Sequence, residues 1–116
     1  MGTLRCFETT TVSATATSGS TSGLTPGSTV SLDDNTTQII VHNKSASEVL
    51  YLYCYNDNQD AGNVNLNNAF EISAGAYLTL SLGSRGNSIG SRLIAGFTTA
   101  ASAFNYKIVQ IQFLSY

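Results

Sequence analysis

Charged residues are scarce in this chain of 116 residues. Asp, Glu, Lys and Arg make up 10 % of it and the formal net charge is −2, whereas a typical soluble domain has about 25 % charged residues. With only 5 Lys and Arg residues no basic patch can form, so nucleic-acid binding is not expected. Ser, Thr, Asn and Gly replace the missing charges. That composition is typical of exposed all-β proteins, and it suits a surface that is covered in an assembly.

Long apolar runs and tryptophans are also missing, and there is a single histidine. No stretch is long and apolar enough to cross a bilayer, and the first residues lack the apolar run of a signal peptide. The single histidine, His42, has no nucleophile motif around it, so a hydrolase is the weakest functional hypothesis. The absence of Trp weakens a sugar-binding role, because Trp is the residue that most often stacks on sugar rings.

Cysteine is rare too, with Cys6 and Cys54 as the only two. Without an export signal, we expect two free thiols rather than one disulfide. Cys54 falls in the strongest predicted strand, so we expect it to be a small buried side chain.

What the chain does contain is a series of short stretches with alternating apolar residues, separated by turn residues. Seven are predicted as strands: 28–32, 37–43, 48–56, 69–73, 77–82, 92–97 and 104–114. No convincing helix is found. Regularly spaced short strands in one domain predict an all-β fold, a single antiparallel β-sandwich of about seven to eight strands, Ig-like or jelly-roll-like.

The first 23 residues differ from the rest. Residues 9–17 are rich in Thr and have strand propensity, whereas the following residues form a Gly/Ser-rich linker. We therefore predict an extended N-terminal arm or linker at 1–23 and the β-sandwich domain at 24–116. The segment could be a flexible leader, but we favour an arm that orders on a neighbour, with Thr10 and Val12 as candidate contacts.

The stretch 48–56 is apolar on both sides, because strand side chains alternate. Its leucines and Cys54 are expected to face the core. Its tyrosines have no partner assigned within the chain, and Tyr is enriched at protein interfaces. Together with a tyrosine of the stretch 77–82, they are the candidate partner or subunit interface: Tyr51, Tyr53, Tyr55 and Tyr77. A sugar-binding face is the less favoured alternative.

Two loops resemble ligand-binding loops only superficially. Residues 56–62 place oxygen ligands at alternate positions, as a calcium loop does, but Gly62 comes one place late and Asn67 stands where the closing Glu belongs. Residues 83–90 are Gly-rich, but no helix follows to bind a phosphate. We therefore expect surface loops, with no metal, no other cofactor and no catalytic residue.

Three motifs carry a resemblance to a known family. They are residues 39–45 (Ile-Ile-Val-His-Asn-Lys-Ser) with the following strand at 49–52, an Ala-Gly turn between strands at 69–80, and a closing hairpin at 93–96 and 106–111. This pattern resembles small β-sandwich virion proteins of tailed bacteriophages, of the capsid decoration or cement type. The likeness covers roughly residues 37–114.

The resemblance implies a non-enzymatic virion structural protein that binds the outer surface of the major capsid protein shell and stabilises it. Its implied partners are the major capsid protein and copies of itself, without nucleic acid or membrane. It would be made in the host cytoplasm and reside on the capsid surface. The alternative is a carbohydrate- or receptor-binding β-sandwich module of a phage tail or surface protein.

Overall fold

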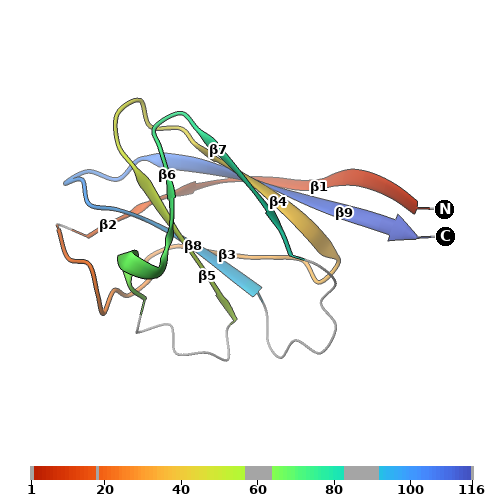
Figure 1. Ribbon diagram of the computed structural model, residues 1–116, viewed down its shortest axis with the longest axis horizontal. Helices are drawn as coiled ribbons and strands as arrows, with labels where there is room; N and C mark the ends of the chain where they lie inside the picture. Colours follow the sequence, from red (N-terminus) through yellow and green to blue (C-terminus); the bar gives the residue numbers. More distant parts are fainter. Residues whose placement is uncertain (1, 18, 57–63, 83–91, 116) are drawn as a thin grey trace.

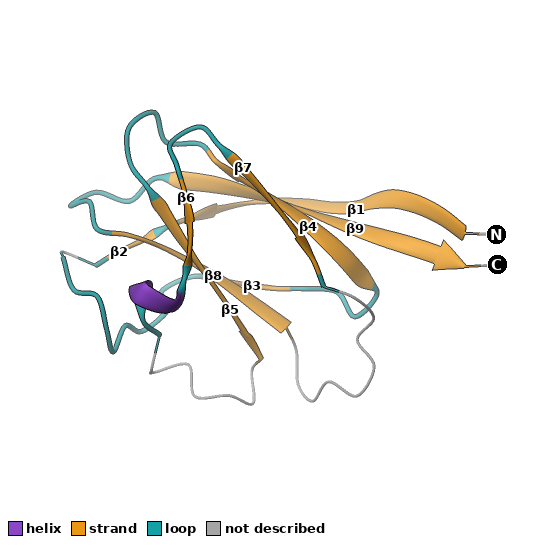
Figure 2. Cartoon of the chain, in the orientation of Figure 1, coloured by secondary structure: helices purple, strands orange, loops and turns teal. Residues whose placement is uncertain are grey.

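The computed structural model describes residues 2–17, 19–56, 64–82 and 92–115 (Figure 1). In these ranges the chain forms strands joined by loops, with one short 3-10 helix (Figure 2). The elements are β1 (Gly2–Ser13), β2 (Thr15–Ala16), β3 (Thr29–Ser31), β4 (Thr36–Asn43), β5 (Leu50–Asn56), η2 (Leu66–Asn68), β6 (Phe70–Ile72), β7 (Tyr77–Ser81), β8 (Arg92–Thr98) and β9 (Asn105–Ser115). The described ranges contain no helix long and apolar enough to span a membrane.

The strands form two sheets. Sheet A has the order β1-β9-β4-β7, and sheet B has the order β2-β8-β5-β6, with β3 also paired to β8. The predicted all-β fold with two sheets is confirmed, and all seven predicted strands lie within one or two residues of observed ones. One strand pair differs from the predicted antiparallel arrangement: β2 runs parallel to β8, whereas every other strand pair of the described residues is antiparallel.

The N-terminal segment is part of both sheets, so the predicted extended arm is not confirmed. β1 pairs with β9 along its length, from Gly2 opposite Ser115 to Ser13 opposite Asn105. The physical reason is that β4 pairs with only one edge of β9, and residues 2–13 supply hydrogen-bond partners for the other edge. Residues 2–4 pair with residues 113–115 beyond the end of β4, and this two-stranded ribbon projects from the sandwich (Figure 1).

The main core lies between the sheets. Its buried side chains come from both of them: Ala14, Val30, Leu32, Ile39, Val41, Leu50, Leu52, Ile72, Ile94, Tyr106 and Ile108. Burying this apolar surface drives the two sheets together, at roughly 25 cal/mol per Å².

Asn43, at the end of β4, is buried and forms hydrogen bonds with the β4–β5 connection and with β6. Its amide nitrogen donates to the carbonyls of Glu48 (2.8 Å) and Ile72 (2.9 Å), and its side-chain oxygen accepts from the backbone N–H of Ser45 (3.0 Å). Buried polar groups need such partners. One side chain therefore ties the β4–β5 connection to the end of β6.

The turn between β3 and β4 is held by the end of β9. The buried Gln110 accepts hydrogen bonds through Oε1 from the backbone N–H of Asp33 (2.8 Å) and from the Thr36 hydroxyl (2.7 Å). Gln112 donates to the Asp33 carboxylate (2.9 Å), and Arg92 donates to the Thr36 carbonyl (2.9 Å). The inward side of β9 is thus polar at this end, because it binds a turn instead of packing on apolar side chains.

Candidate functional surfaces

The three tyrosines of β5 are covered from within the chain. Tyr51, Tyr53 and Tyr55 are half-buried on the outer face of sheet B. They pack against a second apolar cluster: Leu24, Val64, Leu66, Ala95 and Phe97. The expectation that this side has no partner in the chain is therefore wrong, and the tyrosines no longer support an assembly interface.

The residues that cover them were not expected to do so. Leu24 and Val64 form an isolated β-bridge, and the N–H of Leu66 donates to the carbonyl of Thr21 (2.8 Å). These leucines and the valine stand in stretches that otherwise consist of polar and turn residues. The sequence signal that could have revealed this cover is the presence of single apolar residues, Leu24, Val64 and Leu66, in otherwise polar stretches. Such residues indicate that the segment packs on a sheet.

Tyr77 lies on the other sheet. It is 67 % exposed, and its ring stacks on His42, its cross-strand partner on β4, with centroids 4.1 Å apart and planes at 7°. The four candidate tyrosines therefore do not form one surface. His42, considered above as a general base, is instead one half of an aromatic pair.

Thr10 and Val12 face inward from β1. They lie opposite Ile108 and Tyr106 on β9, and Val12 packs against the main core. Their side chains are half-buried by the chain's own residues. The side chains of Thr10 and Val12 are therefore not free to anchor a partner, and what β1 presents at its outer edge is backbone.

The outer face of sheet A is a broad surface with little charge, which we call the sheet A face. The pairing registers place fourteen described side chains on it: Cys6, Thr9, Thr11, Ser13, Gln38, Ile40, His42, Tyr77, Thr79, Ser81, Asn105, Lys107, Val109 and Ile111. Lys107 is the one charged residue of this set. Ile40, Val109 and Ile111 are half-buried by their neighbours and form its aliphatic centre.

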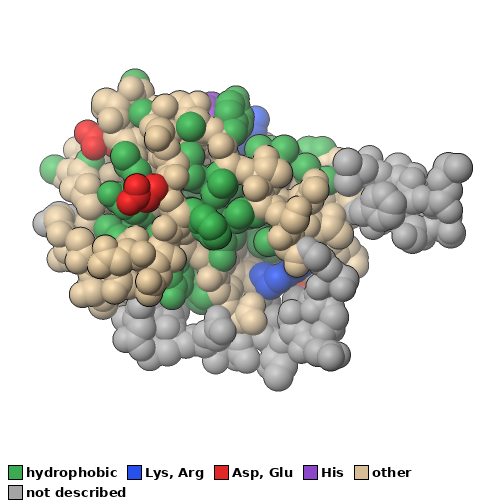
Figure 3. All heavy atoms as spheres, in the orientation of Figure 1, with side chains coloured by type: hydrophobic (Ala, Val, Ile, Leu, Met, Phe, Trp, Pro, Cys, Tyr) green, Lys and Arg blue, Asp and Glu red, His purple; other side chains and the backbone are tan. Residues whose placement is uncertain are grey.

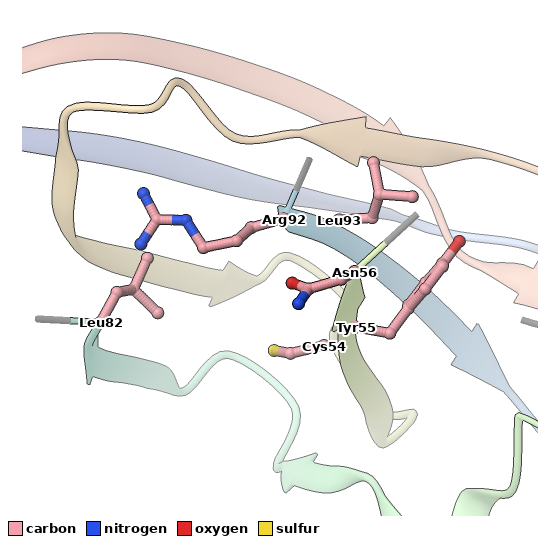
Figure 4. Close-up of a pocket in the computed structure, with 6 residues that line it drawn as sticks. All are labelled: Cys54, Tyr55, Asn56, Leu82, Arg92 and Leu93. Carbon is pink, nitrogen blue, oxygen red and sulfur yellow. The ribbon is translucent and has the colours of Figure 1, made fainter. Parts of the chain in front are cut away.

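Cys54 lines a small cavity of about 220 Å³ at the end of sheet B (Figure 4). In Figure 4 Cys54, Asn56 and Arg92 point toward the side of Leu82, whereas Tyr55 points away. The thiol is exposed, so the prediction of a buried side chain is wrong: β6 pairs with β5 only as far as Leu52 and leaves Cys54 uncovered. The cavity wall still desolvates the thiol and raises its pKa to about 11.

Both cysteines are free, as predicted. In the described ranges no three His, Cys, Asp or Glu side chains are grouped as metal ligands. The possible calcium loop at 56–62, apart from Asn56, and the Gly-rich loop at 83–90 lie outside the described residues.

Comparison with protein-family models, curated proteins and solved structures found no match.

Proposed function

We propose that the chain is a non-enzymatic virion structural protein, a capsid decoration protein that binds the outer surface of the major capsid protein shell through the sheet A face. The orientation of β9 carries the proposal. This strand turns Val109 and Ile111 outward and Gln110 and Gln112 inward. Aliphatic side chains on an outer sheet face, surrounded by hydroxyl groups, are suited to burial against another protein.

The low charge supports the same function. The view in Figure 3 has few charged side chains among apolar and neutral polar atoms, and the described side chains of the sheet A face include one charge, that of Lys107. A surface of this kind loses little hydration energy when a partner covers it, because charges are the groups that are costly to desolvate. Many copies on one shell stabilise it jointly even when each contact is weak. An Ig-like or jelly-roll-like topology and homo-oligomeric assembly are part of this proposal.

The test uses virions of the phage that encodes the chain, prepared with and without its gene. The chain should be present in a fixed copy number set by the shell symmetry, and virions that lack it should release their genome at a lower temperature. Absence of the chain from purified virions would overturn the proposal.

An add-back experiment tests which surface binds. Purified wild-type chain should bind the deficient virions saturably, and Val109→Lys, at the centre of the sheet A face, should weaken binding about tenfold or more by placing a charge in the contact. Ser47→Lys, on the exposed β4–β5 connection, is the matched control and should bind normally. Equal binding by both variants would exclude the sheet A face.

A second candidate function, carbohydrate binding, is favoured by the stacked His42–Tyr77 pair. Tyr77 presents a largely exposed ring in the same strand as Thr79, and His42 on β4 lies between Tyr77 and Lys107 on β9. Aromatic rings stack on sugar faces, and neighbouring polar groups orient the hydroxyls. A glycan array should then show a ligand that Tyr77→Ala no longer binds. Consistent non-binding by the wild-type chain would exclude this function.

A further inference from the structure

The exposed edges of the two sheets are very unequal in length. β7, β6, β3 and β2 have 5, 3, 3 and 2 residues, whereas β1 has 12. β proteins avoid unwanted strand addition by keeping edge strands short, charged, interrupted by Pro or covered. In the described part of the chain every edge strand except β1 is short.

The second half of β1 has none of the other protections. Residues 9–13 are Thr-Thr-Thr-Val-Ser, with no charge and no proline. The one irregularity of β1, between Cys6 and Glu8, lies before this stretch, and the pairing with β9 is regular from Glu8 to Ser13. No strand lies on the other side of β1 among the described residues. A regular, uncharged edge rich in β-branched residues is therefore available for strand addition.

We propose that the outer edge of β1 pairs antiparallel with β1 of a second copy of this chain, so that two sheets A join into one continuous sheet of eight strands. This inference rests on the proposed function, to which it adds the way in which two copies assemble. The pairing itself involves only β1 and can form without a capsid. A two-fold axis relates the copies, and such an axis brings identical strands together in opposite directions.

The sequence of this edge favours a second copy as the partner. With the axis at Thr10, Thr9 of each copy lies opposite Thr11 of the other on the sheet A face, where both side chains are exposed. Cross-strand Thr–Thr pairs are favourable, and no like charges meet. The dimer is also compatible with the proposed capsid contact, because both sheet A faces lie on the same side of the joined sheet and can bind one shell together.

The pairing is tested by charge reversal at exposed positions. Thr9→Lys combined with Thr11→Lys places like charges opposite each other in the pair and should raise the dimer dissociation constant about tenfold or more, as should the corresponding double substitution to Glu. Mixing the Lys and Glu variants should restore a dimer, now a heterodimer. The control carries Thr79→Lys and Ser81→Lys on β7, the opposite edge of the same face, and should dimerise normally.

Sedimentation equilibrium of the purified full chain measures these constants, with circular dichroism to confirm that each variant is folded. A wild-type chain that stays monomeric at all concentrations would overturn the proposal. So would a dimer that is insensitive to the β1 charges, or that the β7 control disrupts equally. These outcomes can be told apart from failure of the capsid contact, because a monomer that is found on virions would refute the pairing and homo-oligomeric assembly but not binding to the shell through the sheet A face.

Discussion

The ring of Tyr106 on β9 lies directly against the backbone of Gly96 on β8, across the space between the two sheets. A Cβ atom placed on Gly96 would lie 2.6 Å from Cζ of Tyr106 and 2.8 Å from its hydroxyl oxygen. Such distances are far shorter than ordinary van der Waals contacts. Tyr106 is completely buried, so the largest fully buried side chain of the core has room only because residue 96 has no side chain.

Gly96→Ala should therefore lower the free energy of unfolding by about 2 to 3 kcal/mol, in the range of overpacked cores. Chemical denaturation measures the change. In a Tyr106→Leu background the same substitution should cost clearly less, because the shorter side chain leaves space for the methyl group. An equal cost in both backgrounds would show that Gly96 is required for another reason.

The burial of Tyr106 also leads us to expect that the free energy of unfolding falls at alkaline pH. Burial raises the pKa of Tyr106 from 10.0 to about 12. The folded state then holds the proton more tightly than the unfolded state. Its contribution is complete below pH 10.0 and is lost as the pH rises toward about 12. The full effect corresponds to about 2 to 3 kcal/mol.

Tyr106→Phe is the matched variant for this effect. The hydroxyl makes no hydrogen bond of ordinary geometry in the part of the chain that the structure describes, and the nearby backbone of Gly96 offsets only part of the rise in its pKa. Its removal should therefore leave the stability near neutral pH unchanged or raise it by about 1 kcal/mol. The difference between wild type and variant should change with pH only in the alkaline range. A variant that loses stability at neutral pH would contradict the absence of a partner for the hydroxyl.

Asn43→Ala should lower the free energy of unfolding by about 2 to 4 kcal/mol, because it leaves buried carbonyls of the β4–β5 connection and of β6 without a donor. Asn105→Ala is the control. Asn105 is exposed and accepts one side-chain hydrogen bond, from Ser13 (3.1 Å), so its loss should cost less than about 0.5 kcal/mol. Similar losses in thermal denaturation would contradict a special role for Asn43.

The strands were predictable because hydrophobic alternation and turn residues are local signals. The pattern could not tell which side of β9 faces inward. Both sides of β9 carry apolar residues: Val109 and Ile111 lie outside, whereas Tyr106 and Ile108 lie in the core. The buried Gln110 and Gln112 on the inner side are paired with the distant turn at Asp33. Only the fold reveals such long-range partners.

The same limit explains why the surroundings of the β5 tyrosines and of residues 2–13 differ from what the sequence suggested. The tyrosine side of β5 is covered by Leu24, Val64 and Leu66, which lie far from it in sequence. Residues 2–13 have strand propensity in part, but it is the edge of β9 not paired with β4 that makes them an integral strand of sheet A. Alternating residues show which side chains share one side of a strand. Which segment buries that side depends on parts of the chain that fold back onto the sheet, and these parts leave only a weak local signal in the sequence.

Cys54 should react slowly with thiol reagents although its side chain is exposed. Its pKa is raised from 9.0 to about 11 by desolvation, and only the thiolate reacts. In a Cys6→Ser variant, the alkylation rate of Cys54 at about pH 8 should be about a hundred times lower in the folded protein than in the denatured chain. The rate should rise about tenfold per pH unit and level off near pH 11.

Steric shielding of Cys54 would give a different result. It would lower the rate by the same factor at every pH, so the folded and denatured chains would still differ above pH 11. If the rate is limited by the pKa, the two rates converge there, because both thiols are then fully ionised. Circular dichroism must show that the chain is still folded at this pH, because the ionisation of Tyr106 also lowers its stability there. In the folded chain, convergence above pH 11, measured by mass spectrometry of the alkylated chain, separates desolvation by the cavity wall from steric shielding.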